Sequence, residues 1–402
     1  MDREALVLRN RTLAQAFHAT PFKHRARRLL LQSVKSLPVR RSQPSRTERI
    51  LLIRPDHLGD VLLTTPAIHA LRTAHPQAEI HALVGPWSAA VLAPYDELDA
   101  IITLPFPGFS RTPKRGLRSP YELAWRSARQ LRQVGYTSAV ILRPDHWWGA
   151  LLAYLAGIPQ RVGFNLPDVV PFLTQAISDE PIHNVRRNLR LVEGWTGQIA
   201  SEGIVYRFPV GEADRAFVDS YLSEWGIAPD QRLLCIHPGS GTWAKRWDES
   251  SWARVADTLT EQLGLPVVFS GGDHELPMVR SIVEQMKTPA CVMAGDTQVG
   301  QLAALFARGQ VVLGPDSGPM HLAAAVGAAT VTLFGPADPA EFAPWGTRDR
   351  HIVLTSDIGC RPCNVIDWGG DDPAYHPCVR EIPISRVLEA ARRAAQASVS
   401  PG

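Results

Sequence analysis

The sequence predicts an α/β protein made of two Rossmann-like domains, each built on a parallel sheet. The chain has 402 residues, and one hydrophobic core rarely serves more than roughly 250 to 300 residues, so two domains are expected. In each half, short apolar runs alternate with helical patterns of about 10 to 15 residues. Such alternation is typical of parallel strands that are covered by helices on both faces.

The first half shows this alternation after a basic amino-terminal arm. "RILLIR" at 49–54 has the pattern of a short buried strand, and after a Gly/Asp turn a helix is expected to end near His75. Another helical pattern runs from Tyr121 to Gln133. Further strands are expected at "AEIHALV" (78–84), "DAIITL" (99–104) and "SAVILR" (138–143).

The second half repeats the alternation, with helices expected at Ser250–Leu263 and Val299–Arg308. Its expected strands are "LLCIH" (233–237), "PVVFS" (266–270), "ACVMA" (290–294), "QVVLG" (310–314) and "TVTLF" (330–334). Gly, Pro and polar residues cluster between Gly197 and Pro209, which predicts the junction there. The predicted organisation is a basic arm at 1–48, a first domain at 49–203, a second domain at 204–384, and a carboxyl-terminal helix and tail at 385–402.

The composition, 45% hydrophobic and 20% charged, is that of a soluble globular protein and excludes collagen-like and wholly disordered classes. The net charge of +3 is unevenly distributed, because residues 1–49 hold 12 Lys/Arg and only 3 Asp/Glu. Such an arm can meet anionic lipid headgroups or nucleic acid, or it can be a solvated, partly helical segment. We expect it to contact anionic membranes peripherally, and we expect no nucleic-acid partner.

The same arm also bears on the location of the protein. No stretch reaches the roughly 18 to 20 apolar residues of a membrane-spanning helix. The first 30 residues carry charges throughout and lack the apolar core of a secretory signal. We therefore expect a cytoplasmic protein with peripheral contact at the inner membrane.

A strand end in the second half carries "GPDSGPMH" at 314–321. The glycines permit close backbone approach, and Asp316 or Ser317 can cap the following helix. Free N–H groups in the first helical turn would favour a phosphate. His321 lies about one turn into that helix, where it can reach the same anion or pack as a core residue.

Two other strand ends in this half carry polar residues. The first is "HPGSGTWAKRW" at 237–247, in which Ser240 and Thr242 can donate hydrogen bonds and Lys245 supplies a positive charge. These groups suit a diphosphate leaving group. The alternative is that the Lys/Arg pair is simply solvated. "SGGDHE" at 270–275 places Asp273 and Glu275 where they could accept hydrogen bonds from a nucleoside, although the same residues suit a turn and helix start.

The comparable turn of the first half is "RPDHLGDVLLTTP" at 54–66. Asp60 follows a glycine at the expected amino terminus of a helix, where it can cap the helix or accept a proton from a sugar hydroxyl. Asp56 and His57 compete with it for the proton-transfer role.

The five cysteines do not suggest a disulfide framework. Cys360 and Cys363 have a metal-ligand spacing, and Cys378 with His376 could complete a structural zinc site. Reduced thiols without a metal are the favoured interpretation, and the zinc site is the alternative.

These motifs together resemble glycosyltransferase family 9, the ADP-heptose lipopolysaccharide heptosyltransferases, from about Ile50 to Ile384. The resemblance is carried by "RPDHLGDVLLTTPAIHALR", "GIPQRVGF", "HNVRRNLRLVE", "HPGSGTWAKRWDESSWARVAD" and "GPDSGPMHLAAAVGAATVTLFGP". It implies a GT-B fold, in which two Rossmann-like domains face each other across a cleft. It also implies an inverting, metal-independent transferase that uses no cofactor.

The resemblance assigns roles to individual residues, beginning with Asp60 as the catalytic base. The residues implied to bind the donor phosphate and sugar are Ser240, Thr242, Lys245, Asp316, Ser317, Gly318 and His321. Asp273 and Glu275 would contact the nucleoside, and the implied acceptor-side residues are Arg54, His57, Arg143 and Arg161.

The reaction expected from the resemblance is transfer of a heptose from ADP-heptose to an anionic lipopolysaccharide core acceptor. One alternative is a related transferase with another nucleotide sugar and acceptor, and a second is a nucleotide-sugar-binding protein without turnover. An NAD-linked oxidoreductase is disfavoured, because neither half opens with Gly-x-Gly-x-x-Gly followed by a ribose-binding acid.

Overall fold

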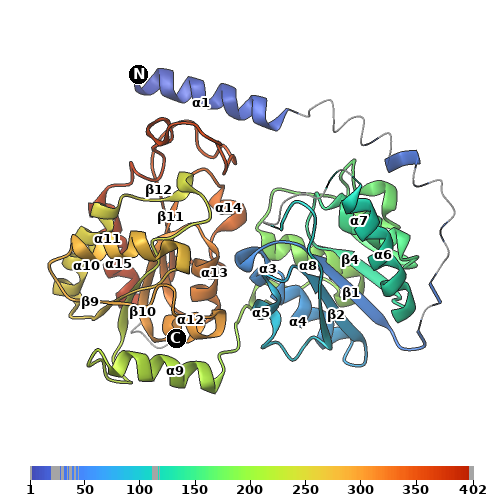
Figure 1. Cartoon of the computed structure of the whole chain (residues 1–402), viewed down its shortest axis with the longest axis horizontal. Coiled ribbons are helices and arrows are strands. Elements are labelled where there is room, and N and C mark those ends of the chain that lie inside the picture. The colour runs from blue at the N-terminus through green and yellow to red at the C-terminus, as the bar shows by residue number, and fades with distance from the viewer. Residues whose placement is uncertain are drawn as a thin grey trace. The chain divides into compact units, whose positions relative to one another are not determined.

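The computed structural model of the chain describes residues 2–19, 45–110, 116 and 118–397, together with residues 28, 31–33, 35, 39, 42 and 43. The chain forms two compact units (Figure 1). The N-terminal unit is Thr20–Tyr206, and the C-terminal unit combines Arg207–Gly402 with Met1–Ala19. The division falls within the Gly- and Pro-containing stretch between Gly197 and Pro209.

The N-terminal unit is a parallel six-stranded sheet in the order β3-β2-β1-β4-β5-β6. The strands are β1 (Arg49–Arg54), β2 (Glu79–Val84), β3 (Ala100–Thr103), β4 (Ser138–Ile141), β5 (Gln160–Phe164) and β6 (Gln175–Ile177). The central strand β1 is buried along five of its six residues. Its continuous apolar run is explained by helices on both faces of the sheet.

The helices of this unit are α3 (Leu58–Leu62), α4 (Thr65–Ala74), α5 (Ala89–Leu92), α6 (Ser119–Val134), α7 (Trp147–Leu155) and α8 (Asn184–Thr196), with short 3₁₀ turns η1 (Val170–Phe172) and η2 (Ser201–Gly203). Helix α6 ends at Gly135, whose φ of 78° is left-handed and therefore favours glycine. Between α6, α7 and the sheet lies a core that includes Phe106, Trp148 and Leu152.

The C-terminal unit repeats the architecture with the strand order β12-β11-β10-β7-β8-β9, again all parallel. The strands are β7 (Leu233–Ile236), β8 (Val267–Phe269), β9 (Ala290–Val292), β10 (Gly309–Pro315), β11 (Ala329–Phe334) and β12 (His351–Thr355). Its helices are α9 (Glu212–Ser223), α10 (Glu249–Leu263), α11 (Leu276–Glu284), α12 (Val299–Arg308), α13 (Gly318–Ala325), α14 (Pro339–Phe342) and α15 (Ile384–Ala397), with 3₁₀ turns η3 (Trp243–Lys245), η4 (Asp273–Glu275) and η5 (Pro373–Tyr375).

Both sheets have the strand order of a doubly wound fold, which confirms the predicted fold class. The order reverses between β1 and β4 in one unit and between β7 and β10 in the other. Ligands of such sheets bind outside the carboxyl ends of the strands at that reversal. The turns after these four strands are therefore where functional side chains are expected.

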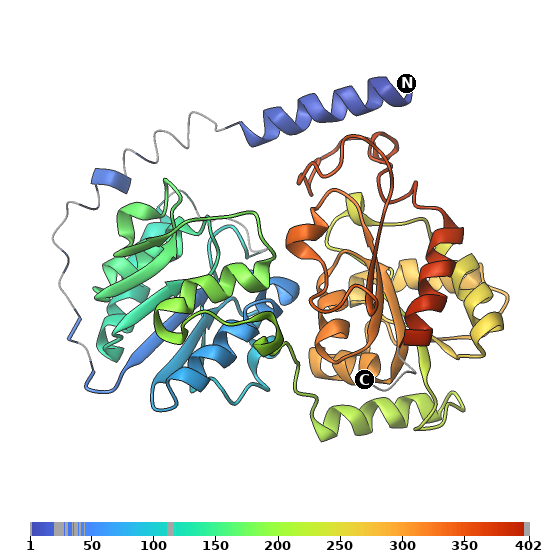
Figure 2. The ribbon, with the colours of Figure 1, turned by 180° about the vertical axis from the view of Figure 1, so that it is seen from behind.

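The amino-terminal helix α1 (Arg3–His18) packs on the C-terminal unit, which the sequence did not reveal. Figure 1 and Figure 2 both show it beside the long loop between β12 and α15. Arg9 forms an ion pair with Asp371 at 2.7 Å, Arg11 donates to the carbonyl of Gly359, and Asn10 donates to that of Tyr375. The basic side chains Arg9 and Arg11 thus bind other parts of the protein.

No described helix is long and apolar enough to cross a bilayer.

Candidate active site

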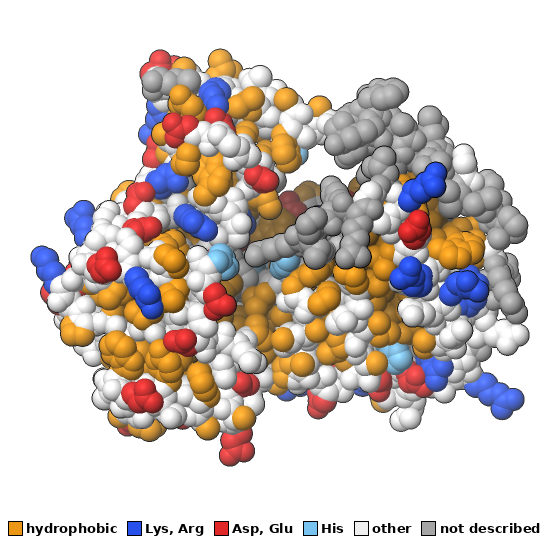
Figure 3. Space-filling view, in the orientation of Figure 1, with side chains coloured by type: hydrophobic (Ala, Val, Ile, Leu, Met, Phe, Trp, Pro, Cys, Tyr) orange, Lys and Arg blue, Asp and Glu red, His pale blue; other side chains and the backbone are white. Residues whose placement is uncertain are grey.

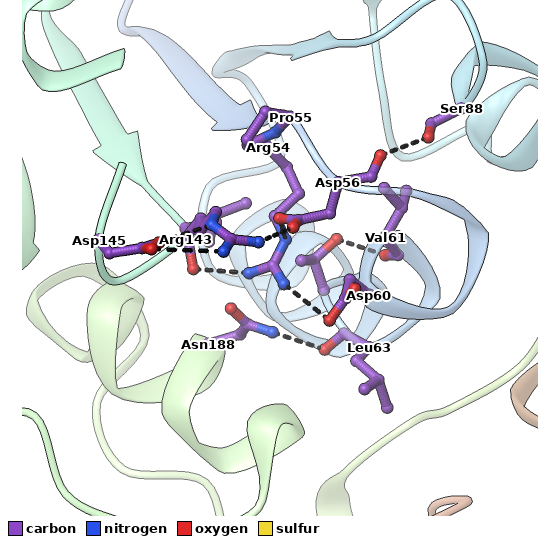
Figure 4. Close-up of polar contacts among 12 residues, drawn as sticks. Arg54, Pro55, Asp56, Asp60, Val61, Leu63, Ser88, Arg143, Asp145 and Asn188 are labelled. Atoms are coloured by element: carbon purple, nitrogen blue, oxygen red, sulfur yellow. Dashed lines mark hydrogen bonds and ion pairs between the residues drawn. The ribbon is translucent and has the colours of Figure 1, made fainter. Parts of the chain in front are cut away.

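The reversal point of the N-terminal sheet holds an arginine–aspartate network (Figure 4). Arg54 is the last residue of β1, and Arg143 follows the end of β4. The carboxylate of Asp56 lies between them. It forms an ion pair with Arg54 Nε at 2.7 Å and a second ion pair with Arg143 Nη1. Parallel pairing of β1 with β4 brings these residues together.

The network keeps Asp56 charged although it is almost completely buried. Burial alone would raise the pKa of Asp56, but Arg54 and Arg143 outweigh burial and lower it. Burial would likewise lower the pKa of Arg143, but Asp56 and Asp145 raise it. Hydrogen bonds from Trp87 and Ser88 to the Asp56 carbonyl fix the backbone of this turn. Asp56 is thus a positioning group rather than a solvent-facing base.

Asp60 lies in the first turn of α3, and its side chain is 37% exposed. Its Oδ1 atom is 3.3 Å from Arg54 Nη2, while Arg54 Nη1 donates to the Leu142 carbonyl at 2.7 Å. Arg54 therefore bridges the buried Asp56 and the accessible Asp60. A carboxylate held in one orientation by an arginine, but still reached by solvent, can accept a proton from a bound hydroxyl.

The two other predicted acceptor-side residues differ in position. His57 is the N-cap residue of α3, is exposed, and lies against the Trp87 ring with 5.5 Å between ring centroids. Arg161 lies near the start of β5, at the amino ends of the strands. Its guanidinium donates to the carbonyls of Phe172 and Ile158. The structure therefore does not bring Arg161 to the Arg54–Asp56–Arg143 network, because the network lies at the opposite, carboxyl ends of the strands.

His146, which the sequence did not single out, is buried beside this network as the N-cap residue of α7. Its ring packs edge-on against Phe106 and Phe109, with centroid distances of 5.2 and 5.8 Å. Neither ring nitrogen has a hydrogen-bond partner among the described residues. Burial lowers the pKa of His146 to about 3, so the ring is neutral at physiological pH.

This burial predicts an acid-sensitive contribution to stability. In the unfolded state His146 binds a proton below its ordinary pKa of about 6.5, whereas in the folded state it binds a proton only below about pH 3. Stability should therefore fall with decreasing pH across that window, by up to about 1.4 kcal/mol per pH unit. His146→Gln removes this slope. Urea unfolding of both proteins from pH 7 to pH 4 measures the difference, and parallel curves would contradict the prediction.

The reversal point of the C-terminal sheet holds a lysine–aspartate pair. Asp316 follows the end of β10 and is buried, and Lys245 ends η3 after β7. Lys245 Nζ lies 2.6 Å from Asp316 Oδ2. Gly314 is required here, because a Cβ at that position would lie 2.7 Å from both the His237 carbonyl and the Met320 sulfur.

The predicted donor-loop residues surround this pair on neighbouring turns. Ser240 and Thr242 brace the turn before Lys245, since Ser240 donates to the Thr242 carbonyl at 2.7 Å and Thr242 donates to the Ile366 carbonyl at 2.6 Å. Ser317 is the N-cap residue of α13, and its buried hydroxyl has no hydrogen-bond partner among the described residues.

Helix α13 supplies the other two predicted donor-loop residues. Gly318 is its first residue, and His321 is buried one turn into it. The amino terminus of this helix and the Lys245 ammonium together suit an anionic group such as phosphate.

The predicted nucleoside-contacting residues have separate environments. Glu275 is buried, accepts a hydrogen bond from the Gly272 amide at 2.8 Å, and approaches His237 Nε2 at 3.7 Å. Burial lowers the pKa of His237, which is only partly offset by Glu275. Asp273 is exposed at the start of η4. Of the two carboxylates, only Asp273 is open to solvent.

The ligands of the zinc site, which the sequence offered only as the less favoured alternative to reduced thiols, are not brought together. No group of three or more His, Cys, Asp or Glu side chains in the described parts of the chain is placed to hold a metal ion. His376 instead lies 2.8 Å from Asp371 Oδ2 and stacks on Trp368. Cys360, Cys363 and Cys378 are free thiols. Burial raises the pKa of Cys378 to about 11, so its thiol is protonated at neutral pH.

Comparison with known proteins assigns the chain to a family. The model described as "Glycosyltransferase family 9 (heptosyltransferase)" matches residues 124–367, more than half of the chain. The chain belongs to glycosyltransferase family 9. It is therefore a glycosyltransferase, and the family predicted from its motifs is confirmed.

Two curated relatives of this glycosyltransferase are lipopolysaccharide heptosyltransferases of Escherichia coli (strain K12). Heptosyltransferase 2 is 24% identical over 360 residues, which cover 85% of this chain and 97% of the relative. Heptosyltransferase 3 is 28% identical over 297 residues, or 71% and 82% of the two chains.

Two solved structures resemble the glycosyltransferase over most of its length. A family 9 glycosyl transferase from Veillonella parvula DSM 2008 is 26% identical with a TM-score of 0.72, covering 89% of this chain and 99% of that one. The E. coli ADP-heptose heptosyltransferase II is 22% identical with a TM-score of 0.68, covering 88% and 100%. The similarity confirms the GT-B class of the fold.

Proposed function

We propose that this enzyme transfers a heptose from ADP-heptose to a lipopolysaccharide core acceptor. The main support is the alignment with lipopolysaccharide heptosyltransferase 2 over 97% of that protein's length. The site agrees with this reaction, because one unit carries an arginine-held carboxylate and the other carries a lysine beside a helix amino terminus. These are the groups needed by an attacking hydroxyl and a departing diphosphate.

In the proposed mechanism, Asp60 takes the proton of the acceptor hydroxyl as that oxygen attacks the anomeric carbon. The bond from the anomeric carbon to the diphosphate oxygen breaks, and negative charge grows on the leaving group. Lys245 and the amino terminus of α13 stabilise that charge. The attack comes from the face opposite the leaving group, so the anomeric centre is inverted, and neither a metal ion nor a cofactor takes part.

Binding roles follow from the same geometry. His57 is exposed and the Arg143 side chain is 34% exposed, so both would contact an anionic acceptor, whereas the buried Arg54 would act on the acceptor side by holding Asp60. Ser240, Thr242, Asp316, Ser317, Gly318 and His321 would shape the site for the donor phosphate and sugar. Asp273 would reach the nucleoside, and Glu275 would act indirectly by fixing the turn at Gly272.

Because a core acceptor is attached to lipid, the enzyme would work in peripheral contact with the inner face of the cytoplasmic membrane.

Nucleotide selectivity tests the donor assignment most directly. Isothermal titration of the full chain with ADP, UDP and GDP should show clear preference for ADP. A preference for UDP or GDP would favour a family 9 transferase with another donor. Mass spectrometry of lipopolysaccharide from a strain without the enzyme would then identify the acceptor, because the core should end where the missing sugar belongs.

A further inference from the structure

Helix α6 of the N-terminal unit exposes an aromatic and cationic surface that the proposed mechanism does not use. This surface, the α6 face, consists of Arg118, Tyr121, Glu122, Trp125, Arg126 and Arg129. All six side chains are exposed, and Trp125 is 59% exposed. They line a shallow depression of about 550 Å³. Figure 3 shows apolar side chains bordered by Lys and Arg over the region where Figure 1 labels α6.

The helical repeat explains why these residues share one face. Tyr121, Trp125 and Arg129 are spaced by four residues, so they form one row along the helix. The opposite face is buried in the core through Ala124, Ala128 and other small or aliphatic residues. The fold therefore does not need Trp125 to be apolar, whereas Tyr121 also contacts the Trp147 ring with 6.4 Å between centroids. Large exposed aromatic residues that gather in one place commonly mark an interaction surface.

The charges of the α6 face are unbalanced. It holds three arginines and one glutamate. Among the residues that the structure describes, no ion pair or side-chain hydrogen bond engages the guanidinium groups of Arg118, Arg126 and Arg129. Arginines nearby in the same unit are engaged: Arg132 donates to the carbonyls of Leu155 and Ala156. The α6 cations are thus available to an external anion.

We propose that the α6 face docks the enzyme on an anionic phospholipid bilayer. Tyrosine and tryptophan rings favour the headgroup level of a membrane, where one end is apolar and the other is wet. Each Arg near an anionic surface contributes about 1 kcal/mol to binding. The proposal rests on the proposed function, because a lipid-linked acceptor requires the acceptor-binding unit to work at a membrane. Helix α1 fits this role less well, since Arg9 and Arg11 already bind the C-terminal unit.

Sedimentation of the full chain with phosphatidylcholine vesicles, with and without phosphatidylglycerol, tests the docking surface. The wild type should bind only the anionic vesicles, and added salt should weaken binding. The triple variant Arg118→Gln/Arg126→Gln/Arg129→Gln should bind roughly 100-fold more weakly, which corresponds to three lost cation contributions. Trp125→Ala should lower binding several-fold.

Matched controls separate the α6 face from charge and aromaticity in general. Trp225→Ala removes a tryptophan that is 49% exposed on the C-terminal unit, and Arg254→Gln/Arg280→Gln removes exposed arginines there. Both should bind like the wild type. Lys23→Gln/Arg25→Gln/Arg27→Gln removes three cations of the basic arm. If that arm variant loses binding while the α6 triple variant keeps it, or if the wild type does not bind anionic vesicles, the proposal is overturned.

The vesicle result does not depend on catalysis, so it can fail separately from the proposed function. With a deacylated, water-soluble core acceptor, the α6 triple variant should retain wild-type turnover, but it should lose turnover on acceptor embedded in anionic vesicles. Equal turnover by both proteins on the embedded acceptor would also count against docking by the α6 face. Absence of heptose transfer by the wild type on either acceptor would reject the proposed function and leave the vesicle-binding result intact.

Discussion

Replacing Asp60 by Asn is expected to lower sugar transfer by roughly 10² to 10⁴ while nucleotide binding survives. Asn has nearly the same shape and can still accept a hydrogen bond from Arg54, which lies 3.3 Å from the Asp60 carboxylate. It cannot take a proton from the acceptor hydroxyl. Because Asp60 belongs to the N-terminal unit, the proposed phosphate site beside Lys245 is unchanged in the variant. Single-turnover transfer and titration with ADP measure the two effects separately.

Asp99→Asn is a suitable control for this experiment. Asp99 is also a carboxylate of the N-terminal unit, is paired with an arginine, Arg72, at 2.5 Å, and has a similar exposure of 43%. Its loss should leave transfer within a few-fold of the wild type. If Asp60→Asn also retained transfer within a few-fold, another group would have to accept the proton, and the proposed mechanism would be wrong.

The sheets could be predicted because their central strands are continuously apolar and are bounded by Gly, Asp and Pro. The strands at 49–54, 138–143 and 310–314 were all expected, and they form the centres of the two sheets. Strand β12 was not expected. It pairs with β11 at the sheet edge, where three of its five residues are partly exposed, and its apolar run is only the three residues Ile352–Leu354.

The positions of site residues could be predicted only as far as local sequence determines them. Asp60, Lys245 and Asp316 were expected in the segments that follow strands, and they lie in α3, in η3 and directly after β10. The contact between Lys245 and Asp316 depends on the pairing of β7 with β10, which brings together residues far apart in the chain. Asp56 bridges Arg54 and Arg143 for the same kind of reason, since β1 must first pair with β4. Strand register, and not residue type, determines these contacts.

Replacing Lys245 by Met is expected to lower transfer by roughly 10² to 10³, because a cation beside the departing diphosphate is lost. The change should also lower the free energy of unfolding by about 3 kcal/mol, since the buried Asp316 carboxylate loses its partner 2.6 Å away. The double variant Lys245→Met/Asp316→Asn removes that unpaired charge. It should recover most of the stability without recovering transfer.

Comparison of the two variants separates a catalytic effect of Lys245 from a structural effect. Urea unfolding measures the stability, and kcat/KM with ADP-heptose measures the transfer. Lys287→Met serves as the control, because Lys287 is exposed in the loop after α11 and should affect neither quantity. If the double variant regained wild-type transfer together with stability, Lys245 would serve only to neutralise Asp316. Persistent loss of transfer in a stable double variant would exclude instability as the cause, and transfer retained by Asp316→Asn alone would then assign the loss to the lysine.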